Sequence, residues 1–212
     1  MSKQQLLVLF AVVAMATIAQ AAVVINEVDY DQPGTDATEF VELYNNGASS
    51  EDLGGMVLEL INGSNNTMYQ TLTLPSFSLA ADGYFVICAN PAGTPNCDYD
   101  WTPETNLIQN GAPDAVILID ALGAIIDAVS YEGSAVAPYV EGTGFGGADS
   151  GSLPFLGISR YPNGVDTDDN SVDFFVKCIT PGSSNSVVEA DCMDPVPAEK
   201  MTWSHLKAMY GR

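Results

Sequence analysis

Apolar and polar residues alternate through most of the chain, in short runs that turn-forming residues separate. Two of these runs, Val23–Tyr30 and Glu39–Tyr44, flank an acidic loop that contains Pro33 and Gly34. A period of two places successive side chains on opposite faces of a strand. The same period recurs at Met56–Ile61, Met68–Leu74, Tyr84–Ala89, Asp114–Asp120 and Ala124–Tyr131. Because short strands at this spacing, with no helical period between them, are typical of sandwiches, we expect an all-β fold.

Residues 1–21 differ from the rest and predict a signal peptide. Lys3 supplies a positive charge, Leu6–Ile18 is a continuous run of apolar and small residues, and Ala19–Ala21 fits the small-x-small rule for cleavage. The run is shorter than the about 20 apolar residues that a membrane span needs. We therefore expect cleavage after Ala21, which leaves a secreted protein that does not insert into a membrane.

The four cysteines of the chain predict two disulfides in a secreted protein, with three formal connectivities. Cys88 and Cys97 flank one turn-rich segment, and Cys178 and Cys192 flank another. Sequential pairing is the simplest arrangement, because each bridge then closes a local loop. Metal binding by these thiols is less favoured, since the chain has no C-x-x-C motif and its lone histidine, His205, lies near the C-terminus.

The segments INEVDYDQPGTD and EFVELYN resemble the opening of the lamin tail domain, an immunoglobulin-like β-sandwich. Later segments are similar to successive motifs of its secreted bacterial members: NLIQNGAPDAVILID, IIDAVSYEG, YVEGTG, GISRYPNGVDTDDNSVDF and CITPGSSN. The resemblance covers residues 23–185 and implies one sandwich domain over residues 22–186. Family members are often fused to nuclease or other hydrolase domains, and we expect this module to stand alone. The resemblance therefore implies no enzymatic role.

Beyond residue 186 the composition changes, and residues 187–212 predict a linker and a short C-terminal helix. Val187–Glu199 is acidic and contains two prolines. Thr202–Tyr210 has an N-capping residue and places Trp203 and Leu206 on one face with Tyr210. One interpretation is a tail that docks on the acidic sandwich or frays, and the other is a recognition tag for export or surface attachment.

The formal net charge of −21 limits the partners of this protein. An acidic surface repels phosphate backbones and anionic lipids, which argues against nucleic-acid or membrane binding. We expect a non-catalytic binding or surface-architecture module whose partner is an extracellular protein or a glycan. The sequence does not indicate an oligomeric state.

Calcium is the most plausible ligand, because it prefers oxygen donors from closely spaced Asp and Asn residues. The first choice is Asp166, Asp168 and Asn170, whose alternation presents three side chains to one ion. The match to an EF-hand is partial, since Ser171 and Lys177 replace its Gly and bidentate Glu. The second choice is the loop that carries Asp29, Asp31, Asp36 and Glu39. Asp and Asn also cap turns, so a purely structural role is equally supported.

Catalysis finds little support in the sequence. A nucleophile needs a base beside it, and the chain offers only His205 and no G-x-S-x-G motif. The alternative function is a secreted metal-assisted hydrolase, or an accessory subunit of one, that uses the strand carboxylates Glu27, Glu39 and Glu42. The alternation favours solvent-facing positions for these three side chains, and we expect them to be solvated.

Overall fold

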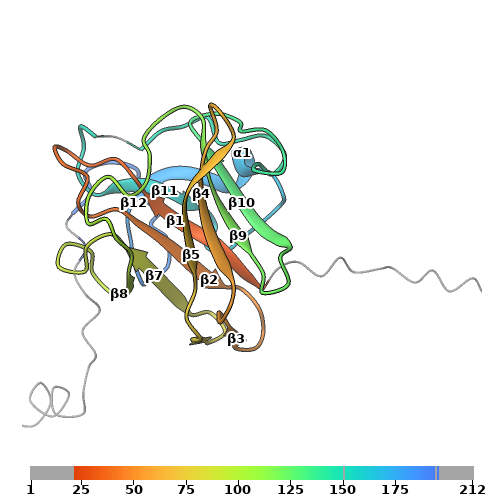
Figure 1. The fold of residues 1–212 in the computed structure, drawn as a ribbon. Coiled ribbons are helices and arrows are strands. Elements are labelled where there is room, and N and C mark those ends of the chain that lie inside the picture. Colours follow the sequence, from red (N-terminus) through yellow and green to blue (C-terminus); the bar gives the residue numbers. More distant parts are fainter. Residues whose placement is uncertain (1–21, 150, 194, 196–212) are drawn as a thin grey trace, which may run out of the picture.

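Two β-sheets pack face to face, with a short third sheet at one end, in the computed structural model (Figure 1). The structure describes residues 22–149, 151–193 and 195. The predicted signal peptide and the predicted helix Thr202–Tyr210 lie outside these residues. The described residues form the all-β sandwich that the alternation of apolar and polar residues predicted.

The larger sheet has six strands in the order β12–β11–β1–β2–β7–β8. They are β1 (Val23–Asp29), β2 (Phe40–Asn45), β7 (Tyr84–Cys88), β8 (Cys97–Asp100), β11 (Leu156–Arg160) and β12 (Phe174–Cys178). Neighbouring strands are antiparallel, except for the parallel pair β7 and β8. The predicted opening hairpin is present as β1 and β2, at the centre of the sheet.

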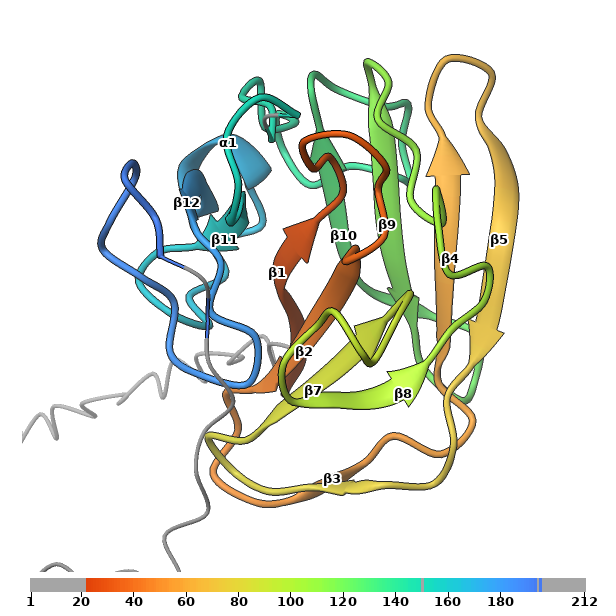
Figure 2. The same cartoon turned by 90° about the vertical axis from the view of Figure 1, so that its left-hand side faces the viewer.

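The smaller sheet faces the larger one and has the order β10–β9–β4–β5 (Figure 2). Its strands are β4 (Val57–Asn62), β5 (Thr67–Thr73), β9 (Asp114–Ile119) and β10 (Ile125–Tyr131). The third sheet pairs β3 (Glu51–Asp52) with β6 (Ser78–Leu79), and the short helix α1 (Asn170–Asp173) precedes β12. None of the described helical residues forms a segment long and apolar enough to cross a membrane.

The main hydrophobic core fills the space between the two large sheets. Leu58 and Leu60 of β4 point into it, as the period of two predicted, and Trp101 joins it with 6% of its surface exposed. Burial of one such large apolar side chain contributes about 1.5–3 kcal/mol relative to exposure. The inner faces of both sheets are therefore the principal source of stability.

A β-bulge in β1 turns two consecutive polar residues to the outer face of the six-stranded sheet, which faces away from the four-stranded sheet. The register with β2 shifts between Ile25 and Glu27. Ile25 and Val28 point into the main core, whereas Asn26 and Glu27 bind polar groups on the other side. An extra residue of this kind re-aims side chains that a regular strand would place on alternate faces.

The outer face of the six-stranded sheet is covered as well. The chain that follows β12 folds back across it, on the side away from the four-stranded sheet (Figure 2). Ile179 of this returning segment packs with Phe40, Val86 and Cys88 in a separate hydrophobic cluster. The central strands of this sheet are thus buried on both faces, as their uninterrupted burial shows.

Both disulfides join the cysteines that sequential pairing predicted, Cys88 to Cys97 and Cys178 to Cys192. The second bridge is one of several links between β12 and the chain beyond residue 186, where we expected a linker. The N–H of Cys178 donates to the carbonyl of Val188 at 2.9 Å. The contacts of the fold therefore continue at least as far as Cys192.

Candidate functional site

Two of the three strand carboxylates lie directly opposite each other. Glu27 on β1 pairs across the sheet with Glu42 on β2, and both side chains are fully buried. The expectation that these carboxylates are solvated was wrong. They do point away from the main core, but the segment that follows β12 covers the outer face on which they lie.

Each of these glutamates holds the covering segment through its backbone. Glu27 accepts hydrogen bonds from the Thr180 N–H at 3.0 Å and from the Ser159 hydroxyl at 2.8 Å. Glu42 accepts from the Gly182 N–H at 2.7 Å and from the Asn26 amide at 2.8 Å. The two carboxylates therefore fasten the end of the chain to the centre of the sheet.

Burial perturbs both acids strongly. It raises the pKa of Glu27 to about 7, although the hydrogen bonds from Thr180 and Ser159 oppose the shift. Burial also raises the pKa of Glu42 well above its ordinary value, and the neighbouring Glu27 adds to that effect. Removing a carboxylate from water disfavours its charged form, and a second carboxylate nearby disfavours it further.

Glu39 is buried in a different place. It accepts hydrogen bonds from the N–H groups of Leu107 at 2.7 Å and Ile108 at 3.0 Å, and these two residues belong to the main core. Burial raises the pKa of Glu39 to about 7. Glu39 therefore binds a different segment of the chain from the one that Glu27 and Glu42 hold.

The acidic loop after β1 brings together part of its predicted calcium set. One amide nitrogen, Nδ2 of Asn110, lies 3.3 Å from Asp31 and 3.4 Å from Asp36. Glu39 faces the main core, and Asp29 turns toward the loop that precedes β11. Within the described part of the chain, no three of these four acids bring carboxylate oxygens within 4.8 Å of one another. Calcium binding by the full set stays a prediction.

The side chains of the first-choice calcium set, Asp166, Asp168 and Asn170, do not converge on one point. The Asp166 carboxylate accepts from the backbone N–H of Asp168 and from Arg160, both at 3.2 Å. Asp168 is exposed. The Asn170 amide is buried against β10, where it accepts one backbone N–H at 3.0 Å and donates to a carbonyl at 2.8 Å. The alternation therefore does not aim the three side chains at one point, and calcium binding there also stays a prediction.

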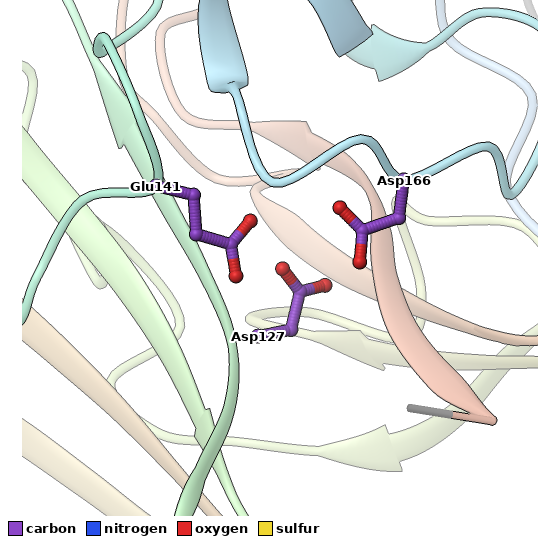
Figure 3. A group of neighbouring side chains, drawn as sticks. All are labelled: Asp127, Glu141 and Asp166. Carbon is purple, nitrogen blue, oxygen red and sulfur yellow. The ribbon is translucent and has the colours of Figure 1, made fainter. Parts of the chain in front are cut away.

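Asp166 instead belongs to a cluster that the sequence did not reveal. Asp127 on β10, Glu141 in the following loop and Asp166 point toward one another (Figure 3), with carboxylate oxygens within 4.8 Å. Burial, with Asp127 and Asp166 beside it, raises the pKa of Glu141 to about 9. Three acids at such distances need a positive charge or a proton between them.

Arg160 supplies that positive charge. Its fully buried guanidinium lies 2.8 Å from Asp127, 3.2 Å from Asp166 and 3.8 Å from Glu141. It also contacts the Asp173 carboxylate of α1 at 3.0 Å. The guanidinium supplies a positive charge to these carboxylates, so this group ties β10, β11 and α1 together as an ion-pair network.

The charge that remains at the surface is negative. The basic side chains among the described residues are Arg160, which is buried, and Lys177, which is 4% exposed. Lys177 binds Glu189 at 2.7 Å and lies over the Tyr161 ring. Neither of these two side chains is available to a phosphate or an anionic lipid. The absence of nucleic-acid and membrane binding stays a prediction from the net charge.

The residues that sequence reasoning missed have one visible signal. Arg160 is the only basic residue between Lys3 and Lys177 in the sequence, and it ends a strand in which every residue is buried. A single arginine in such a strand indicates that several carboxylates from elsewhere surround it. Their identities, Asp127, Glu141 and Asp173, depend on tertiary contacts that have no local pattern.

Comparison with known proteins agrees with the sandwich and with its opening motifs. No curated protein matches the chain. The profile of the lamin tail domain matches residues 16–133, more than half of the chain, and this stretch includes every strand from β1 to β10. The later motifs, from residue 134 onward, lie beyond the matched part. The chain belongs to the lamin tail domain family.

Proposed function

We propose that this protein is a secreted, non-catalytic lamin-tail module that binds an extracellular protein or a glycan and contributes to surface architecture. Membership of the family supports an immunoglobulin-like module. The two disulfides support an oxidising compartment, where such bridges persist. Calcium stabilisation is part of the proposal, because the fold carries many more buried acids than cations.

The observation that carries the proposal is the burial of the strand carboxylates and the hydrogen bonds that they accept. Glu27, Glu39 and Glu42 are buried, and each accepts backbone N–H groups from a neighbouring segment. A hydrolytic acid or base must reach the substrate, directly or through one water molecule. Buried carboxylates that accept hydrogen bonds from backbone N–H groups stabilise the fold and do not face a substrate.

One surface cavity favours the glycan among the two partner classes. It has a volume of about 380 Å³ and is lined by Tyr84, Asn96, Cys97, Asp98 and Gly182. An aromatic ring beside an amide and a carboxylate offers both an apolar face and hydrogen-bonding groups. A sugar ring presents the complementary combination of C–H faces and hydroxyl groups.

Retention on immobilised ligands tests the proposal. The chain from residue 22 onward is passed over a panel of extracellular polysaccharides and over extracellular proteins of its source, and the released products are analysed. We expect retention without product release, and weaker retention of Tyr84→Ala on the polysaccharide that binds. Tyr161→Ala, at an exposed tyrosine elsewhere, is the matched control. Product release that Glu27→Gln abolishes would overturn the proposal, as would a complete lack of retention.

A further inference from the structure

The cavity that favours a glycan partner is formed by three separate segments of the chain. Tyr84 begins β7, and Cys97 and Asp98 are the first two residues of β8. Gly182 belongs to the segment that returns across the sheet after β12 and is held there by Glu42. The cavity volume of about 380 Å³ lies in the range of small-molecule sites.

Bonds between these segments fix the walls of the cavity. The first disulfide holds Cys97 against β7. The Asn96 side-chain amide donates to the Pro181 carbonyl at 2.8 Å, and the Gly182 N–H donates to the Glu42 carboxylate at 2.7 Å. A cavity whose walls are held in this way is formed before a ligand enters, so binding costs little conformational entropy.

The charges around the cavity are negative. Asp98 is exposed in its wall, and its Oδ2 accepts the Val86 N–H at 2.9 Å. Burial raises the pKa of Tyr84, and the carboxylates of Glu42 and Asp82 add to this shift. Asp98 also adds to the rise that burial causes in the pKa of Glu42. The described residues that line the cavity include no basic side chain, so the local field attracts a cation.

We propose that this cavity binds an amino-sugar residue of an extracellular glycan, whose protonated amine pairs with the Asp98 carboxylate. The inference rests on the glycan binding of the proposed function, and it names the class of sugar. The Tyr84 ring offers an apolar surface to the C–H face of the sugar and a π-face to the cation. A uronic acid or a sulfated sugar would bring a second negative charge to Asp98, so the same field disfavours it. A lysine side chain carries the same ammonium group, but the volume of the cavity and the Tyr84 ring suit a sugar ring better.

Calorimetric titration with two matched oligosaccharides tests the inference in the disulfide-bonded chain from residue 22 onward. The probes are a short β-1,4-linked glucosamine oligomer and its fully N-acetylated counterpart, which has the same rings and linkages without the charge. The buffer is mildly acidic, so that the amine is protonated, and its physiological ionic strength screens long-range attraction. We expect the glucosamine oligomer to bind about tenfold more tightly or better, as a charge-assisted hydrogen bond provides. Equal binding of the two oligomers, or binding of neither, would overturn the inference without any variant being made.

Two variants locate the charge that makes this distinction. Asp98→Asn keeps an oxygen for the Val86 N–H, so it should weaken binding of the glucosamine oligomer by about tenfold and leave binding of the acetylated oligomer unchanged. Glu104→Gln removes an exposed acid beyond the other end of β8 and should bind as the parent does. Equal weakening in both variants would show general attraction between opposite charges and would overturn the inference.

A lysine-rich peptide of the same charge distinguishes the two sources of an ammonium group. Competition by this peptide as strong as that of the glucosamine oligomer would overturn the inference in favour of a protein ligand. Retention on the wider panel of polysaccharides and proteins is measured separately, so failure of the amino-sugar site leaves the test of the binding function intact.

Discussion

Raising the pH from 5 to 8 should destabilise this protein, because several buried acids, Glu27 and Glu39 among them, hold protons that the unfolded chain releases. Burial raises the pKa of Glu27 and the pKa of Glu39 from 4.5 to about 7. Between these values the folded state binds more protons than the unfolded state, so the free energy of unfolding falls as pH rises. The contribution is fully present below pH 4.5 and is lost as pH rises through about 7.

The magnitude follows from the size of the shift. Each pKa unit corresponds to about 1.4 kcal/mol of differential stabilisation. A rise from 4.5 to about 7 therefore corresponds to about 3 kcal/mol for Glu27, which is fully buried and little screened by solvent. Glu39, with its side chain held against the core, acts in the same direction. A total stability of about 5–15 kcal/mol for a typical domain makes such a change easy to measure.

Denaturant unfolding at pH 5, 6, 7 and 8, in chelator and at constant ionic strength, measures the effect. The parent protein should lose stability by several kcal/mol across this range, at least on the order of the contributions of Glu27 and Glu39 together. Glu27→Gln cannot release a proton at this position. Its free energy of unfolding should therefore fall by about 3 kcal/mol less than that of the parent between pH 5 and 8. Glu104→Gln should follow the parent. A parent stability that is constant or increases from pH 5 to 8, or an unchanged slope in Glu27→Gln, would refute the reasoning.

Three further variants probe the rest of the architecture. Arg160→Met leaves buried carboxylates without their counter-ion and should cost about 3–5 kcal/mol by denaturant unfolding; an unchanged midpoint would contradict the ion-pair network. Replacing Cys178 and Cys192 by Ser removes a bridge across 14 residues and should cost about 3 kcal/mol, and equal stability of the two forms would contradict it. Asn185→Ala removes side-chain bonds to the Asn26 and Arg160 carbonyls, so limited proteolysis should cut after β12 faster; an unchanged cleavage rate would show that the returning segment is held by other contacts.

The strands of the hairpins could be predicted from the sequence because their evidence is local. The period of two in Val23–Tyr30 or Met56–Ile61 is read directly from neighbouring residues. Sequential disulfide pairing is local in the same sense, and the structure confirms it. The strand β8 was missed because it has four residues and lies inside a turn-rich stretch that the first disulfide closes.

The environment of the carboxylates could not be predicted in this way. The alternation places Glu42 outward correctly, but only the later segment around Gly182 decides whether that face meets water or protein. The bulge at Asn26 also breaks the period that placed Glu27. Asp166 was selected for a local D-x-D-x-N pattern, whereas its actual partners, Asp127 and Arg160, come from two different strands. Long-range contacts of this kind leave no pattern in nearby residues.

The direction of the strands at one edge of the larger sheet has a mechanical consequence. Both β1 and β12 are antiparallel to β11, so they run in the same direction. The start of β1 at Val23 and the end of β12 at Cys178 therefore lie at opposite ends of these three strands. A force that pulls these ends apart loads the inter-strand hydrogen bonds in shear, together rather than one after another. The Cys178–Cys192 bridge passes tension directly into β12, so the segment that covers Glu27 and Glu42 lies outside the load path. A module built in this way resists stretching between its ends while its buried acids stay covered.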